Sequence, residues 1–107
     1  MSLHMHCRID LPHWLESFVE DWPDPLESAS QRMQLAISLS AENVRHGTGG
    51  PFGAIVVEQE SNRLLGVGVN LVTEVELSIA HAEMVAISLA RAPSTTGTWV
   101  RIQRFNW

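Results

Sequence analysis

The chain has 107 residues, of which 45% are hydrophobic and 18% are charged, and its formal net charge at pH 7 is -5. This size and composition predict one small domain and exclude a disordered acidic tail. The excess of acidic residues argues against general nucleic-acid binding, and no apolar run is long enough to predict a membrane span. The single cysteine, Cys7, excludes an internal disulfide and predicts a reducing, cytoplasmic location.

Residues 1–24 are predicted to form an N-terminal arm that packs over a domain of residues 25–107. Proline interrupts the arm at Pro12, at Trp22-Pro23 and at Asp24-Pro25. Between these breaks, a short amphipathic helix fits residues 14–20. The arm also contains His4, His6 and Cys7, which we interpret as a mobile terminus rather than as a metal site.

The first long helix is predicted to begin near Asp24 or Ser28. With Asp24 as the N-cap, Pro25 takes the first helical position and Glu27 completes a capping box. Gly47 provides a C-terminal stop. The residues expected to face the core are Leu26, Met33, Ile37 and Val44, with Ala29, Ala36 and Ala41 near them.

A hairpin and a second helix are predicted to follow. Residues 52–58 form a buried strand and residues 64–70 its partner, in which Gly66 and Gly68 allow another segment to approach closely. A loop over residues 71–78 leads to a helix over residues 79–92, and residues 98–107 can hold a third strand. The inner face of the second helix is predicted to consist of Ala82, Val85, Ala86 and Leu89.

The segment most informative about chemistry is Ala80-His81-Ala82-Glu83-Met84, which opens the second helix. A neutral imidazole such as that of His81 can ligate zinc. A carboxylate beside the metal, here Glu83, can accept a proton from zinc-bound water and deliver it to a leaving amine. The two residues match H-x-E, the first part of the zinc deaminase signature H-x-E…P-C-x-x-C. Ordinary surface side chains on a helix produce the same pattern.

Two further segments narrow the interpretation. Gly49-Gly-Pro-Phe-Gly-Ala54 opens the first strand, and Gly68-Val-Asn70 closes its partner. Together with the H-x-E segment, they resemble the cytidine/deoxycytidylate-type zinc-dependent deaminase superfamily over about residues 28–92. The resemblance is closest to its guanine deaminase and tRNA adenosine deaminase branch, and Phe52 favours guanine deaminases. It implies a partial cytidine-deaminase-like α/β fold of helix, antiparallel hairpin, helix and a possible third strand.

The resemblance also implies roles for individual residues. His81 is expected to be one of three zinc ligands and Glu83 the catalytic proton shuttle. Asn70, Phe52 and Ala82 are expected to bind the substrate, a small purine base or nucleoside. Asn70 has plain alternatives as a turn residue, and Phe52 as a core residue. Complete relatives are expected to be homodimers.

The chain departs from the family pattern at the zinc site. The family supplies two cysteine ligands from a P-C-x-x-C motif, but no cysteine follows Cys7 in this sequence. We therefore expect residues 25–107 to be a truncated domain that lacks the P-C-x-x-C half of the zinc site and is inactive by itself. The intact enzyme would release an amine as ammonia by hydrolysis, with guanine as the preferred substrate. The alternative is a non-catalytic interaction module, or a shortened subunit that pairs with an intact deaminase.

Overall fold

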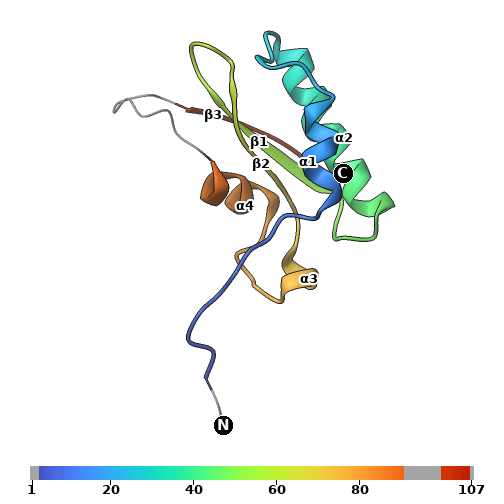
Figure 1. Ribbon diagram of the computed structural model, residues 1–107, viewed down its shortest axis with the longest axis vertical. Helices are drawn as coiled ribbons and strands as arrows, with labels where there is room; N and C mark the ends of the chain where they lie inside the picture. Colours follow the sequence, from blue (N-terminus) through green and yellow to red (C-terminus); the bar gives the residue numbers. More distant parts are fainter. Residues whose placement is uncertain (1–2, 91–99, 107) are drawn as a thin grey trace.

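The computed structural model describes residues 3–90 and the backbone of residues 100–106. Its elements, in chain order, are α1 (Trp14–Glu20), α2 (Ala29–Arg45), β1 (Phe52–Glu58), β2 (Leu64–Val69), α3 (Val72–Val75), α4 (Ala82–Leu89) and β3 (Val100–Asn106). Figure 1 shows the arrangement, with the first residues of the arm extending away from the body. No helix in the described part of the chain is long and apolar enough to cross a membrane.

The three strands form one antiparallel sheet in the order β2-β1-β3. β1 and β2 form the predicted hairpin, with Gly53 opposite Val69 and Ile55 opposite Val67. The predicted third strand is present as β3, which pairs along β1 from Phe52 to Glu58. β1 is therefore the central strand, as its almost continuous burial requires.

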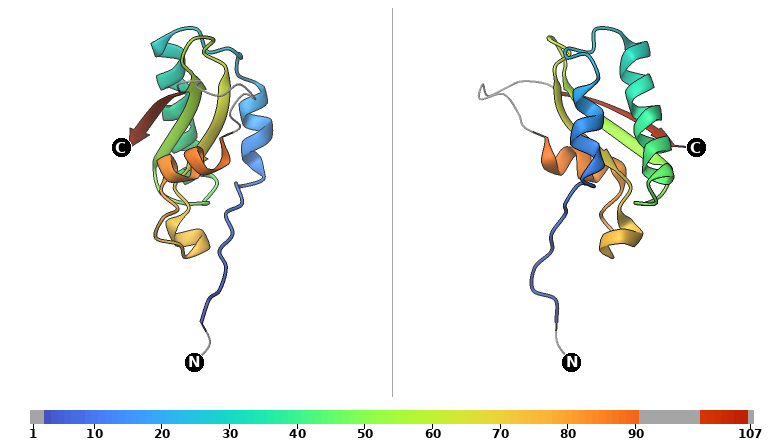
Figure 2. Two further views of the ribbon diagram at one scale, coloured as in Figure 1. Left: turned by 90° about the vertical axis from the view of Figure 1, so that its left-hand side faces the viewer. Right: turned by 45° about the vertical axis from the view of Figure 1, so that its right-hand side comes forward.

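Helices cover both faces of the sheet (Figure 2). Because successive side chains of a strand point to opposite faces, β1 serves two clusters. Ile55 and Val57 belong to the larger core, with Leu35 and Leu39 of α2. The smaller core, on the α4 side, is made by Ala54, Val56, Ala82 and Ala86. The arrangement is an α/β sandwich of α2, sheet and α4.

The predicted close approach occurs at Gly68, where α4 packs directly on β2. A Cβ atom at Gly68 would lie 2.3 Å from the carbonyl oxygen of Ala82 and 2.5 Å from the backbone nitrogen of Ala86. No side chain fits in this space, so glycine lets the first turns of α4 lie on the strand. The contact fixes the start of α4 relative to the end of β2.

The start of α2 decides between the two predicted N-caps. Ser28 is the cap, because its side chain accepts a hydrogen bond from the backbone nitrogen of Gln31 and the Gln31 side chain accepts one from the backbone nitrogen of Ser28. The alternative start at Asp24 is wrong. The Asp24 side chain instead accepts a hydrogen bond from the backbone nitrogen of Leu64, at 3.0 Å, at the start of β2.

The predicted inner face of α2 is wrong at most positions, although Ala36 is buried as expected. Val44 is 52% exposed, Met33 and Ile37 are half-buried, and Leu26 is buried but precedes the helix. The buried residues of α2 are Arg32, Leu35, Ala36, Leu39, Ser40 and Asn43. They recur at helical spacing, but half of them are polar, so a search for apolar residues selects a neighbouring face. The predicted stop at Gly47 is confirmed, with φ of 67° two residues after the helix ends.

The arm and the second helix show smaller differences. The predicted helix over residues 14–20 is confirmed as α1, and Trp14 and Leu15 are buried in the larger core. The segment predicted as a loop contains the one-turn helix α3. α4 begins at Ala82 rather than near residue 79, and Ile79 is 53% exposed in the preceding loop. The predicted continuation over residues 91–92 lies outside the described residues.

Candidate functional site

Backbone hydrogen bonds bring the end of β2 beside the start of α4. The backbone nitrogen of Leu71 donates to the carbonyl oxygen of Ala80 at 2.8 Å, which closes the loop that separates the two elements. The backbone nitrogen of Asn70 donates to the carbonyl oxygen of Phe52 at 3.2 Å. Three segments distant in sequence, around residues 52, 70 and 81, therefore meet at one end of the sheet.

Asn70 lies at the centre of this junction and is only 9% exposed. Its side-chain oxygen accepts a hydrogen bond from the backbone nitrogen of Val72 at 3.3 Å. Only the oxygen of an amide can accept, so this contact sets which way the amide points. The side-chain nitrogen makes no hydrogen bond within the described part of the chain, and its donors remain available to a ligand.

A buried asparagine of α2, which the sequence reasoning missed, holds the junction from the other side. The Asn43 side-chain nitrogen donates to the carbonyl oxygens of Asn70 and Gly50, each at 2.9 Å. Its side-chain oxygen accepts from the Thr48 hydroxyl at 2.7 Å, and that hydroxyl oxygen accepts from the Trp14 indole nitrogen at 3.0 Å. The only sequence signal was a polar residue at helical spacing from Leu35, Ala36 and Leu39.

The glycine-rich segment before β1 passes close to Asn70. Gly49 has a φ of 156°, and a Cβ atom there would lie 1.9 Å from the carbonyl oxygen of Asn70 and 2.9 Å from the Asn43 side-chain nitrogen. Glycine alone adopts this conformation readily and leaves room for both groups. The Gly-Gly pair therefore lets the segment reach the junction before it turns into β1.

His81 is the N-cap residue of α4, and Glu83 lies in the first turn of that helix. The His81 side chain is exposed and makes no capping hydrogen bond. Glu83 is half-buried. Both residues thus lie at the N-terminal end of α4, where the helix dipole favours an ionised carboxylate.

The other two predicted substrate residues occupy different positions at the junction. Phe52 is half-buried at the start of β1 and packs against the smaller core, with Ala54 and Ala82. The Ala82 side chain is fully buried between α4 and the sheet. Only the backbone of Ala82 can face a ligand, and the first backbone N–H groups of a helix have no partner within it.

The described residues do not complete a zinc site. Among residues 3–90, no group of three or more His, Cys, Asp or Glu side chains is placed to hold a metal ion. His4, His6 and Cys7 are exposed on the extended arm. A catalytic zinc takes three protein ligands, and the junction offers the single imidazole of His81.

Sequence comparison identifies one family with this arrangement. The model described as the cytidine and deoxycytidylate deaminase zinc-binding region matches residues 26–101. Guanine deaminase from Bacillus subtilis (strain 168) is 40% identical over 58 residues, which cover 54% of this chain and 36% of that protein. The matched range of the family model includes all of the segments on which the resemblance was based.

Solved structures show the same fold. Guanine deaminase from Nitrosomonas europaea matches with a TM-score of 0.76 and 28% identity, over 95% of this chain and 59% of that chain. A protein solved in complex with 2,6-diaminopurine matches with a TM-score of 0.76 and 31% identity, over 91% and 54% of the two chains. The chain thus spans less than two thirds of the length of the relatives it matches.

Proposed function

Because this chain belongs to the cytidine and deoxycytidylate deaminase family, whose zinc-binding region matches residues 26–101, we propose that it supplies the base-binding and proton-transfer part of a guanine deaminase. The preference for guanine is supported by the relatives from Bacillus subtilis and Nitrosomonas europaea. The proposed reaction adds water at the ring carbon that bears the amine and releases ammonia, which converts guanine to xanthine. The family's α/β fold accounts for the described elements.

The observation that carries the proposal is the position of Asn70 at the meeting point of β1, β2 and α4. Its backbone is held by Phe52 and Asn43, while its side-chain nitrogen retains two donors for a ligand. An amide donor of this kind suits a carbonyl or ring-nitrogen acceptor of a purine edge. The Phe52 ring would form part of the pocket wall, and the backbone of Ala82 would face the base.

Glu83 is proposed as the residue that moves protons. A carboxylate at the first turn of α4 can take a proton from the attacking water and return one to the departing amine. The N-terminal end of a helix favours a negative charge, which suits a carboxylate at this position. This role requires that the substrate amine lies within hydrogen-bonding reach of Glu83.

Zinc is the metal of this family. His81 would supply one of the three protein ligands that catalytic zinc requires, and no other ligand is provided by the residues that the structure describes. We therefore propose that a polypeptide of these 107 residues binds zinc weakly and has negligible turnover. We also propose that residues 25–107 form a partial deaminase domain and that residues 1–24 form an arm that covers it.

Metal analysis and an ammonia assay test this proposal on the same sample. The purified chain, loaded with zinc and then dialysed, is expected to retain well below one zinc per chain and to release no ammonia from guanine above a protein-free control. His81→Ala should lower the residual zinc, whereas replacement of the exposed arm residue His4 by alanine should not. Stoichiometric, chelator-sensitive zinc together with ammonia release would contradict the proposed incompleteness.

A second candidate function, a non-catalytic or shortened subunit that pairs with an intact deaminase, is favoured by the outward face of α4. Met84 and Ile87 are 46% and 47% exposed on this short helix, and Leu89, predicted for its inner face, is 38% exposed at its last residue. Apolar side chains gathered on one helix favour burial against another protein surface. The same face would serve the homodimer expected for complete relatives, in the cytoplasmic setting predicted from the sequence.

Analytical ultracentrifugation with and without an intact guanine deaminase distinguishes the two candidates. Pairing predicts a complex whose formation is abolished by Met84→Glu with Ile87→Glu but not by the exposed-site control Glu74→Gln. A chain that stays separate from the intact enzyme at micromolar concentrations would exclude the subunit function and leave the deaminase proposal in place.

A further inference from the structure

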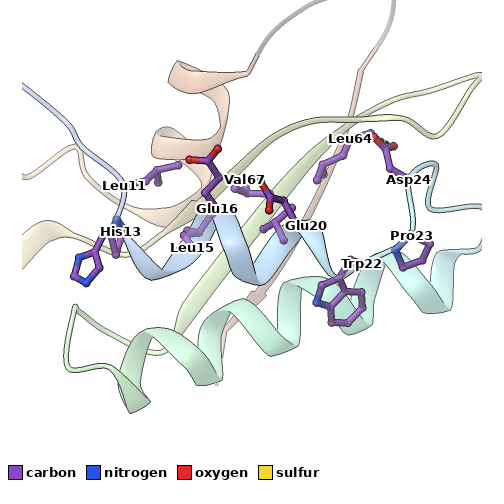
Figure 3. A pocket seen from close by; sticks show the side chains of 12 residues that line it. Leu11, His13, Leu15, Glu16, Glu20, Trp22, Pro23, Asp24, Leu64 and Val67 are labelled. Atoms are coloured by element: carbon purple, nitrogen blue, oxygen red, sulfur yellow. Dashed lines mark hydrogen bonds between the residues drawn. The ribbon is translucent and has the colours of Figure 1, made fainter.

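A cavity of about 650 Å³ lies between α1 and the hairpin, away from the junction described above (Figure 3). Leu15 and Val19 of α1 and Leu64 and Val67 of β2 provide apolar walls. None of the proposed deaminase residues lines it. Its volume is in the range that encloses a small organic molecule, typically about 300–1,000 Å³.

The first turn of α1 is its most buried part, although Phe18 and Val19 also pack against the larger core. Trp14 and Leu15 are buried, whereas Glu16 and Glu20 are exposed and Val19 is half-buried. The remainder of the helix therefore leaves part of the β2 surface uncovered. This opening is built into the described fold and does not involve the deaminase site.

Carboxylates occupy the side of the cavity that faces the hairpin. Figure 3 shows Glu16 and Glu20 on the side of α1 directed towards Val67, with Asp24 beside Leu64 at the far end. No arginine or lysine occurs among the described lining residues, and the single histidine there is His13.

These carboxylates have no cationic partner in the described part of the chain. The ion pairs there join Arg8 to Asp10, and Arg45 and His46 to Glu42. Two glutamates four residues apart on a helix repel each other, so Glu16 and Glu20 weaken α1 in the absence of a bound cation.

We propose that this cavity binds a small organic amine, with an apolar body on the Leu15, Val19, Leu64 and Val67 surface and an ammonium group at the carboxylates. Charge complementarity decides the class of ligand. An anion would be repelled by Glu16 and Glu20, and a neutral apolar molecule would gain the apolar contact without the attraction to the carboxylates. A cation with an aromatic or branched aliphatic body uses both features of the cavity. The proposal is independent of the proposed deaminase function, because the two sites share no residue.

Titration of the ¹⁵N-labelled chain with 2-phenylethylammonium at low salt tests the proposal. We expect saturable shifts at the backbone amides of Leu15, Val19, Leu64 and Val67, and weaker binding as salt screens the charges. The matched probes are 2-phenylethanol, which is neutral, and 3-phenylpropionate, which is anionic. The ammonium should bind about fivefold more tightly than the alcohol, and the carboxylate should not bind. Equal binding of the alcohol, shifts confined to other residues, or no shifts would overturn the proposal.

A pair of double variants separates a specific site from the general attraction of an acidic protein. Glu16→Gln with Glu20→Gln removes two exposed carboxylates at the cavity and should weaken binding of 2-phenylethylammonium about fivefold. Glu74→Gln with Glu76→Gln changes the net charge equally at exposed positions outside the cavity and should leave binding unchanged. Equal losses in both variants, or no loss in the first, would overturn the proposal. All four positions are exposed, so both proteins should retain the parent spectrum away from the changed residues.

Discussion

The Asn43 side-chain nitrogen donates a hydrogen bond to the carbonyl oxygen of Asn70 at 2.9 Å. This contact connects a buried polar residue of α2 with the residue that we propose contacts the substrate, 27 positions later in the chain. Asn43 also holds Gly50 and is itself held by Thr48, which accepts a hydrogen bond from Trp14 of the arm. The arm thus contributes to the base of the proposed site as well as to the core.

Replacement of Asn43 by alanine should lower the free energy of unfolding by about 2–3 kcal/mol, because it leaves buried carbonyl groups without their donor. Chemical denaturation measures the change. Gln34→Ala, at an exposed position of the same helix, is the matched control and should change stability by less than about 0.5 kcal/mol. Equal stability of the two variants would show that the hydrogen bonds to Gly50 and Asn70 contribute little.

Replacement of Gly49 by alanine should destabilise the chain by about 3 kcal/mol, since the new Cβ atom would overlap the carbonyl oxygen of Asn70. Gly47→Ala is an informative comparison. Gly47 also has a positive φ, but a Cβ atom there meets nothing within 4 Å, so only backbone strain of about 1–2 kcal/mol is expected. Thermal unfolding that ranks the two variants equally would contradict the close packing at residue 49.

Replacement of Gly68 by alanine should loosen α4 from β2, because a methyl group cannot fit beside the Ala82 carbonyl oxygen. Hydrogen exchange at the backbone amides of α4 should accelerate by at least about tenfold, with a smaller change in α2. Equal acceleration in both helices would indicate global destabilisation instead. Unchanged exchange in α4 would refute the proposed role of Gly68 in placing the start of that helix.

The Arg45 side chain, through a hydrogen bond, lowers the pKa of Glu42 below its ordinary value, and His46 assists. A lowered pKa in the folded state stabilises the fold above the unfolded pKa and loses this effect as pH falls through the folded value. Chemical denaturation of the parent and of Glu42→Gln should therefore show a stability difference at neutral pH that disappears roughly between pH 5 and 3. Glu74→Gln is the exposed control, and its difference in stability from the parent should not change with pH in this way.

The sequence predicted the elements with strong local signals. The bounds of α1 and β1 agree with the structure, and the glycines of β2 predicted the approach of another segment, which is α4. Gly47 marked the end of α2 because a left-handed residue is needed there. In each case the signal lies in a short stretch of neighbouring residues.

The buried face of α2 could not be predicted in this way, because tertiary contacts make its polar residues buried. Arg32 is buried because its guanidinium donates to the Leu26 carbonyl oxygen and to the Asn62 side chain, 30 residues away. Asn43 is buried because Gly50 and Asn70 accept its hydrogen bonds. Neither partner set is visible as a local pattern.

The candidate site was predicted through its resemblance to a family. The structure brings the segments of Phe52, Asn70 and His81 together, but the roles of these residues and of Glu83 remain predictions. The sequence also gave no indication of the cavity beside α1, which depends on how one short helix is placed over a distant hairpin.

The most direct test of the central claim is ammonia release from guanine by a chimera. It joins this chain, through β3, to the part of Nitrosomonas europaea guanine deaminase that follows the matched region. We expect zinc-dependent deamination, a loss of about 100-fold in kcat for Glu83→Gln with zinc retained, and a raised KM for Asn70→Ala. A zinc-loaded chimera that deaminates guanine equally well with Glu83→Gln would contradict the account.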